Sequence, residues 1–273
     1  MVIGRRLICA IILLQLSLVG AIGVRSNVLG EIPMSDETAR LSSYEYVEKL
    51  LPILSSDTKK AIKCLDKIAT YNSSAALLLG DIYRKGEYGE KIDVARAIGY
   101  YQIAEGMNNV DAMCSLGIIY LDAEGGIARN VTKGLEYLTK SAEKGCVTAQ
   151  ANLGFFYENG MKEYGMAADP EKSYKYSEMA AKQGHRYSLF TVGRYCFEGV
   201  VTEKNEEKGL DYLIKAAEAG SFKAYNYLKE HADAGNSSCC LLMADILENG
   251  KCGQIKNSTK SAEYRKLAEE NGD

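Results

Sequence analysis

The 273-residue chain contains no tryptophan, three prolines and two histidines, whereas alanine, leucine and tyrosine are abundant. This composition favours helices over a β-sandwich. The formal net charge is −3, so the chain lacks the basic excess with which many proteins bind nucleic acid. We therefore expect a helical protein that does not act on DNA or RNA.

Motifs that mark catalytic or metal sites are also missing from the sequence. It has no CxxC pair, which argues against a thioredoxin-like site or a zinc ribbon, and neither a P-loop nor a Rossmann glycine fingerprint. The histidines, His185 and His231, have no repeated acidic or cysteine neighbours. The sequence predicts a protein that is not an enzyme and holds no cofactor or metal.

The first residues have the layout of a secretory signal. Two arginines in "MVIGRR" precede the apolar run "LICAIILLQLSLV", and small residues follow at Ala21 and Gly23. We predict a signal peptide over residues 1–23, and no membrane span once it is cleaved. The alternative is an uncleaved anchor, because apolar character continues to about Val24.

Cysteine usage leaves the redox chemistry open. Seven cysteines follow the signal segment, at Cys64, Cys114, Cys146, Cys196, Cys239, Cys240 and Cys252. An odd number in a secreted chain leaves one thiol free or paired with another chain. We expect most of them to be small buried apolar residues, with one or two disulfides at most.

A 15-residue segment near the start of the chain recurs in similar form near its end, with further copies between them. "NSSAALLLGDIYRKG" begins at Asn72, and "NSSCCLLMADILENG" begins at Asn236. Intermediate copies align on a central small residue, and their spacing of 37 to 51 residues indicates a repeat. The aligned positions are Gly80, Gly117, Gly154, Gly193 and Ala244. Glycine inside a helix is unfavourable, so its recurrence predicts close helix–helix approach there.

A second phrase alternates with the first and always starts with Asp or Asn. These residues are expected N-caps, at Asp57, Asp93, Asn130, Asp169, Asn205 and Asn257. Fifteen residues later comes Asn or Gly, which we expect to end the helix in left-handed conformation, at Asn72, Asn108, Gly145, Gly184, Gly220 and Gly272. Each repeat is thus predicted to be helix A, a short loop, helix B and a tight turn.

The same pattern predicts the division of the chain. After the signal come an N-terminal segment with a degenerate helix (24–56), a partial repeat helix (57–71) and four repeats (72–220). Residues 221–235 read as an irregular single helix without a second cap, and residues 236–273 as the last repeat. The fold class is therefore all-α, an α-solenoid of about five helix-turn-helix repeats, because one hairpin cannot bury its apolar face alone.

The phrases "ALLLGDIYRKG" and "NVTKGLEYLTKSAEKG" resemble the Sel-1-like repeat family, a relative of tetratricopeptide arrays. The resemblance implies a right-handed solenoid that acts as a protein-binding adaptor. One eukaryotic branch consists of luminal subunits of the ubiquitin-ligase complex of endoplasmic-reticulum-associated degradation. A cysteine-rich bacterial branch has one disulfide per repeat, but the cysteines here fall at unequal repeat positions.

Candidate sites follow from the sequons and from the expected binding face. Four Asn-x-Ser/Thr sequons predict N-glycosylation, at Asn72, Asn130, Asn236 and Asn257, although all four positions also suit caps or turns. We expect partners to bind the concave face lined by helices A, with Arg84, Asn159 and Arg194 as provisional contacts. The repeated tyrosines are expected to pack between helices. The basic residues three positions after each expected N-cap are expected to lie in solvent near an acidic neighbour; they are Lys60, Arg96, Lys133, Lys172, Lys208 and Lys260.

These features favour a non-enzymatic adaptor of the secretory pathway, in the lumen of the endoplasmic reticulum and in its degradation machinery. The alternative is a secreted protein that binds a receptor or host factor outside the cell. A hydrolase similar to the cysteine-rich bacterial branch is the least favoured hypothesis.

Overall fold

The computed structural model describes residues 58–272, which all belong to one compact unit, Leu50–Asp273. The predicted signal peptide, the segment 24–56 and the predicted cap Asp57 lie outside the described residues. Within the described part there are twelve α-helices and no strand. Their bounds are α3 (Thr58–Ile68), α4 (Ser73–Lys85), α5 (Val94–Gly106), α6 (Val110–Asp122), α7 (Val131–Glu143), α8 (Val147–Asn159), α9 (Pro170–Lys182), α10 (Arg186–Glu198), α11 (Glu206–Glu218), α12 (Phe222–Asp233), α13 (Ser237–Asn249) and α14 (Ser258–Asn271).

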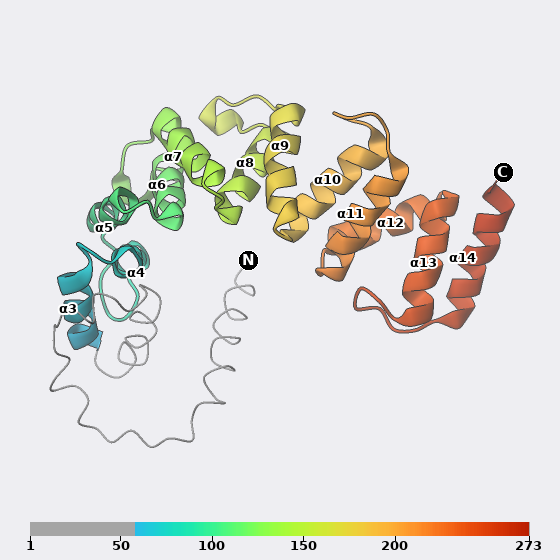
Figure 1. Ribbon diagram of the computed structural model, residues 1–273, viewed down its shortest axis with the longest axis horizontal. Coiled ribbons are helices and arrows are strands. Elements are labelled where there is room, and N and C mark those ends of the chain that lie inside the picture. Colours follow the sequence, from blue (N-terminus) through green and yellow to red (C-terminus); the bar gives the residue numbers. More distant parts are fainter. Residues whose placement is uncertain (1–57, 273) are drawn as a thin grey trace, which may run out of the picture. The chain divides into compact units, whose positions relative to one another are not determined.

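Successive helices form antiparallel hairpins that follow one another in chain order, as Figure 1 shows. Helices α4, α6, α8, α10 and α13 take the A position, and α5, α7, α9, α11 and α14 take the B position. The A helices of neighbouring repeats also touch directly, α6 with α8 and α8 with α10. The predicted all-α solenoid of five helix-turn-helix repeats is confirmed.

The predicted N-caps begin the B helices. The side chain of Asp93 accepts a hydrogen bond from the backbone N–H of Arg96, and Asn130 does the same for Lys133. Equivalent bonds start α9, α11 and α14, at Asp169, Asn205 and Asn257. Each bond satisfies a backbone donor that has no partner within the helix.

The turns from helix B to the next helix A use a left-handed residue, as predicted, in the middle of the array. Asn108 has φ +62°, and Gly145, Gly184 and Gly220 follow the same pattern. The prediction is wrong at both ends. Asn72 has φ −128° and caps the start of α4, and Gly272 has φ −96°.

The central glycines mark the points where the two helices of a repeat approach most closely. A Cβ atom on Gly117 would lie 2.7 Å from Cγ of Leu138 and 2.9 Å from the carbonyl oxygen of Gly134. Gly80, Gly154 and Gly193 are equally crowded by their partner helices. The predicted close approach is therefore confirmed.

Three repeats hold a stacked pair of tyrosines between helix A and helix B. The pairs are Tyr83–Tyr100, Tyr120–Tyr137 and Tyr157–Tyr176, with ring centroids 5.7 to 6.0 Å apart. This confirms the predicted packing role of these tyrosines.

A basic side chain of helix B covers each helix-A tyrosine of these pairs. The Arg96 guanidinium lies 4.0 Å from the Tyr83 ring centroid, and Nζ of Lys133 lies 4.2 Å from that of Tyr120. Lys172 lies over Tyr157 and also pairs with Asp169. As expected, Arg96 is exposed and has Asp66 in its surroundings, and the electron-rich face of Tyr83 attracts it as well. Lys133 is partly buried instead and donates to the Tyr120 hydroxyl.

Helix α12 is the single helix predicted between the fourth and last repeats. It buries Ala224, Leu228 and Ala232 in a core that continues from α10 to α14. The helix has one cap, in which the Ser221 side chain accepts from the N–H of Ala224 at 3.3 Å. Gly235, at φ +89°, then forms the same kind of turn as Gly220.

Candidate protein-interaction surface

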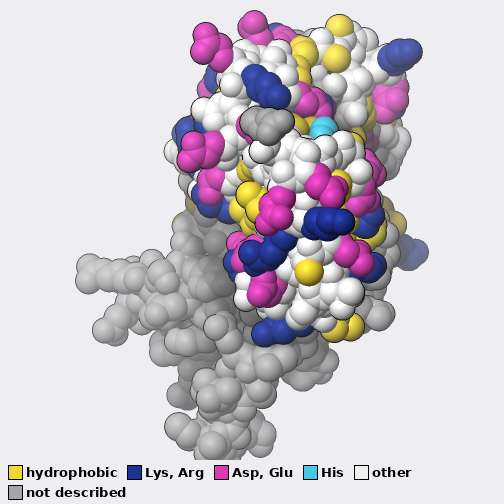
Figure 2. Space-filling model, turned by 90° about the vertical axis from the view of Figure 1, so that its right-hand side faces the viewer, with side chains coloured by type: hydrophobic (Ala, Val, Ile, Leu, Met, Phe, Trp, Pro, Cys, Tyr) yellow, Lys and Arg dark blue, Asp and Glu magenta, His cyan; other side chains and the backbone are white. Residues whose placement is uncertain are grey.

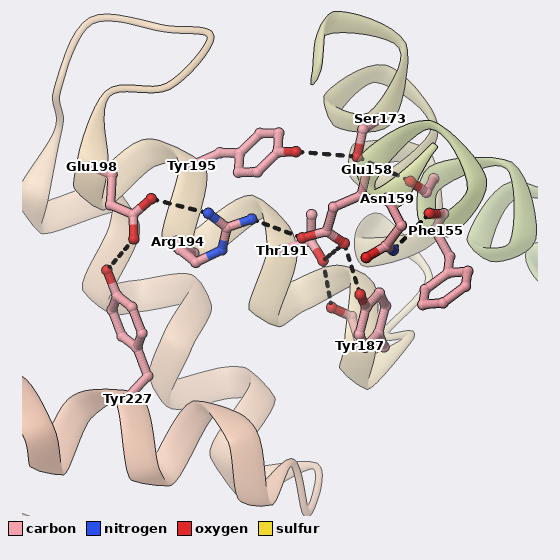
Figure 3. Close-up of polar contacts among 11 residues, drawn as sticks. Phe155, Glu158, Asn159, Ser173, Tyr187, Thr191, Arg194, Tyr195, Glu198 and Tyr227 are labelled. Atoms are coloured by element: carbon pink, nitrogen blue, oxygen red, sulfur yellow. Dashed lines mark hydrogen bonds and ion pairs between the residues drawn. The ribbon is translucent and has the colours of Figure 1, made fainter. Parts of the chain in front are cut away.

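A polar network joins three helices that alternate along the chain, α8, α10 and α12, none of which form a hairpin with one another. It consists of Glu158, Tyr187, Arg194, Glu198 and Tyr227, and we call it the A-helix network (Figure 3). On α10, the residues Tyr187, Arg194 and Glu198 follow the spacing that places side chains along one helix face. The network therefore runs along one face of the A helix α10 and reaches the A helix α8 on one side and α12 on the other.

The Arg194 guanidinium is the centre of this network. One of its nitrogens donates to Glu158 at 2.7 Å, and the other donates to Glu198 at 3.0 Å. Tyr187 donates its hydroxyl to Glu158 at 2.7 Å, and Tyr227 donates to Glu198 at 2.9 Å. These bonds fix the third repeat, the fourth repeat and α12 against one another.

The network is partly shielded from water, and its carboxylates affect their neighbours. Burial and the hydrogen bond to Glu158 raise the pKa of Tyr187, and burial and Glu198 do the same to the pKa of Tyr227. Burial opposes the charge on Arg194, but Glu158 and Glu198 outweigh it and raise the pKa of the guanidinium. Both tyrosines thus remain neutral donors and Arg194 remains charged at physiological pH.

An exposed aromatic lies beside the network. The Phe155 side chain on α8 is 40% exposed and contacts the Tyr187 ring edge-on, with centroids 5.8 Å apart. One turn further along α8, the exposed Asn159 donates its amide to the Phe155 carbonyl at 2.9 Å. An apolar ring next to a carboxylate-rich network offers a partner both apolar contact and polar pairing.

The three provisional contact residues are placed differently by the structure. Asn159 lies on α8 next to Glu158, the residue that pairs with Arg194 of α10 (Figure 3). Arg84 lies apart from them, on α4, where its guanidinium donates two hydrogen bonds to the Glu124 carboxylate, one of them 2.7 Å long. Arg84 and Arg194 are therefore engaged within the chain, whereas Asn159 faces solvent.

The other network residues were missed by the analysis of the sequence. Tyr187 does not recur at the same place in other repeats and Tyr227 lies outside them, whereas Glu158 is matched only by Glu248 in the last repeat, so the repeat pattern did not mark these residues. Only Glu198 had a local signal, because it follows Arg194 by four residues and is a helical ion-pair partner.

The four sequon asparagines are all N-caps. Asn72 accepts from the N–H of Ala75, and Asn236 accepts from that of Cys239. Asn130 and Asn257 start α7 and α14, as described above. Their amide nitrogens differ, since that of Asn236 donates to Glu206 at 2.6 Å, whereas Asn130 is exposed. Glycosylation of these residues stays a prediction.

The two histidines have structural contacts. His185 caps α10, with Nδ1 3.4 Å from the N–H of Ser188, and burial lowers its pKa. His231 packs against the rings of Phe197 and Tyr227. Among residues 58–272, no cluster of His, Cys, Asp and Glu is arranged to hold a metal.

The surface was searched for patches of one charge, and the helices for possible membrane spans. Figure 2 shows basic and acidic side chains intermixed over one face of the described part rather than gathered by sign. None of the helices between residues 58 and 272 has the length and apolar character that crossing a membrane requires.

Curated relatives of this chain include fungal regulatory proteins. Chitin synthase regulatory factor 3 of Schizosaccharomyces pombe is 32% identical over 133 residues, which are 48% of this chain and 14% of the relative. A chitin synthase regulator of Saccharomyces cerevisiae is 28% identical over 153 residues, 54% of this chain and 22% of the relative. The chain thus matches less than a quarter of the length of either protein.

Solved structures share the fold. A Sel1 repeat protein from Oxalobacter formigenes aligns with a TM-score of 0.54 at 21% identity, over 84% of this chain and 97% of that one. A protective antigen of uropathogenic Escherichia coli with an SLR fold gives 0.55 at 21% identity, over 78% of this chain and 50% of that one.

The repeat phrases match a family model at five places, described as Sel1 repeat. The matches cover residues 73–109, 110–146, 147–185, 187–221 and 237–273, and they leave out α12. Together they span more than half of the sequence, so the chain belongs to the Sel1 repeat family.

Proposed function

We propose that this protein is a non-enzymatic scaffold that binds another protein through the face of its A helices, around the A-helix network. The observation that carries the proposal is the fixed arrangement of α8, α10 and α12, with Phe155 exposed beside it. Because the network already orders these side chains, a partner that docks there loses little conformational entropy of the surface.

The compartment is part of the same proposal. The basic and apolar N-terminal segment and the four sequons support entry into the secretory pathway. We place the protein in the endoplasmic reticulum, as an adaptor in its degradation machinery, with secretion and binding outside the cell as the alternative.

A second candidate function is the regulation of an enzyme by direct binding. The similarity to fungal chitin synthase regulators favours it. In this case the partner is a synthase rather than a component of a degradation complex. Both functions use a protein-binding face, and the identity of the captured partner distinguishes them.

The test combines capture of partners with matched surface variants. The chain is isolated from its own cells after chemical cross-linking, as the unaltered protein and as a Phe155→Ala/Asn159→Ala variant. A control variant, Thr132→Ala/Glu136→Ala, changes two exposed residues of the B helix α7. Circular dichroism is recorded for all three.

We expect the first variant to lose most of the captured partner at unchanged helicity, and the control to retain it. Equal capture by all three proteins, or loss in the control alone, would exclude the A-helix face as the binding surface.

A further inference from the structure

Cys146 occupies a position where every other turn of its kind carries a side-chain cap. The corresponding residues are Asn109, His185, Ser221 and Asn236, and each accepts a hydrogen bond from a backbone N–H of the next helix. At the start of α8 the Cys146 side chain forms no regular cap and has only a weak interaction with the N–H of Ala149, because sulfur is a poor acceptor. A cysteine that gives up a cap here costs helix stability, so its presence calls for another role.

The Cys146 thiol points instead toward helix α6 of the preceding repeat. Its sulfur lies 3.4 Å from a carboxylate oxygen of Asp111, and Cys114 follows Asp111 by one helical turn. Cys114 and Cys146 share one hydrophobic cluster between the second and third repeats, and each is 4% exposed.

The two thiols also interact directly. A hydrogen bond from the Cys114 side chain lowers the pKa of Cys146 to about 6, against the effect of burial, and the N–H of Ala149 adds to it. The same contact, together with burial, raises the pKa of Cys114. Cys146 is therefore the member of the pair that ionises more readily, and Cys114 is the hydrogen-bond donor to it.

The remaining cysteines of the described part lack this arrangement. Cys239 and Cys240 are adjacent in α13, and the Cys240 thiol donates to the carbonyl of Ala232. Cys196 lies 3.8 Å from the Tyr174 hydroxyl.

We propose that Cys114 and Cys146 form a disulfide that joins helix α6 of the second repeat to the start of helix α8 in the third. The bond goes beyond the protein-binding function and does not depend on which partner is bound. Glutathione disulfide, or a protein disulfide of the same reactivity, is the oxidant.

The reaction is a double thiol–disulfide exchange. The Cys146 thiolate attacks one sulfur of glutathione disulfide, whose S–S bond breaks and releases one glutathione thiolate. Cys114 then loses its proton, and its thiolate attacks the Cys146 sulfur and releases the second glutathione. Two cysteine thiols are oxidised to one disulfide, and one glutathione disulfide is reduced to two thiols. Because both side chains are buried in the folded repeat, the bond forms during folding and is then protected from reductants.

The test maps the bond after refolding. The full chain is reduced, unfolded and refolded in a glutathione redox buffer, and free thiols are then alkylated. Trypsin separates the two cysteines, because Cys114 lies in the peptide 97–129 and Cys146 in the peptide 145–162. We expect mass spectrometry without reduction to find these two peptides linked in most molecules.

Variants and melting give independent readouts. Cys114→Ser removes the link and leaves Cys146 alkylated, whereas Cys196→Ser, at a buried cysteine in another repeat, retains it. The oxidised chain melts several degrees above the reduced chain, and a Cys114→Ser/Cys146→Ser variant shows no such shift.

Recovery of both peptides with alkylated thiols, or linked to other cysteines, overturns the proposal. If a variant does not fold, the peptide map of the unaltered chain still decides the question.

Discussion

Arg194 on α10 reaches across a repeat boundary to Glu158 on α8, at 2.7 Å, and its other nitrogen holds Glu198 on its own helix. The Glu158 side chain is 13% exposed and also accepts the Tyr187 hydroxyl. The Arg194 guanidinium thus balances the charge of the largely buried Glu158 carboxylate and links two adjacent repeats.

Replacing Arg194 by methionine tests this role. The apolar stem remains, but Glu158 loses its counter-charge in a shielded site, so we expect a loss of about 1–3 kcal/mol in the free energy of unfolding. Arg186→Met, at an exposed position of the same helix, serves as the control and changes stability by less than about 0.5 kcal/mol. Urea unfolding measures both, and equal effects would show that the ion pair is dispensable.

Two glycine substitutions separate helix propensity from packing. Gly117→Ala places a Cβ 2.7 Å from Leu138, and we expect it to destabilise the chain by about 1–3 kcal/mol. Gly99→Ala in α5 has nothing within 4 Å of the new Cβ and is expected to stabilise by up to about 1 kcal/mol. Thermal melting compares them, and a stabilising Gly117→Ala would contradict the close helix approach.

His185 gives stability a pH dependence of predictable sign. Its pKa in the folded chain lies below the ordinary 6.5, first because of burial and then because of Arg186. The unfolded chain therefore binds the proton more tightly. The contribution of His185 is complete above pH 6.5 and is lost as the pH falls from there through the folded pKa.

The matched variant for this prediction is His185→Asn. Asparagine caps the equivalent turns at Asn109 and Asn236, so the cap is kept while the titrating group is removed. We expect the unaltered chain to lose more stability than the variant between pH 7.5 and 5.5, measured by urea unfolding. Parallel pH profiles of the two proteins would assign the effect to other groups.

The sequons predict a glycoprotein, and they differ in how accessible their asparagine side chains are in the structure. Asn130 is exposed at the start of α7, whereas the amide nitrogen of Asn236 is engaged by Glu206. We expect Asn130→Gln to remove one glycan from the protein made in its own cells, seen as a gel shift sensitive to glycosidase. An unmodified protein, insensitive to glycosidase, would argue against the secretory compartment.

Local chemistry made the fold predictable from the sequence. The Asx caps, the glycine at four of the five helix crossings and the stacked tyrosines recur in register, so each copy supports the interpretation of the others. Caps act on the next three residues, and crossings act within one hairpin. Neither depends on distant parts of the chain.

The candidate surface was less predictable because its contacts are long-range and occur once. Arg84 pairs with Glu124, 40 residues away, and Arg194 with Glu158, 36 residues away. Repeat positions say which helix carries a residue, but not which neighbour in the next repeat meets it.

The stacked tyrosine pairs, in a chain without tryptophan, provide three equivalent sites for an optical reporter. A tryptophan in place of Tyr100, Tyr137 or Tyr176 would be the sole indole in the protein, with the same kind of ring beneath it each time. Its emission would then follow the loss of packing in one chosen repeat. Comparing the three variants during unfolding would measure over how many repeats the array melts as a single cooperative unit.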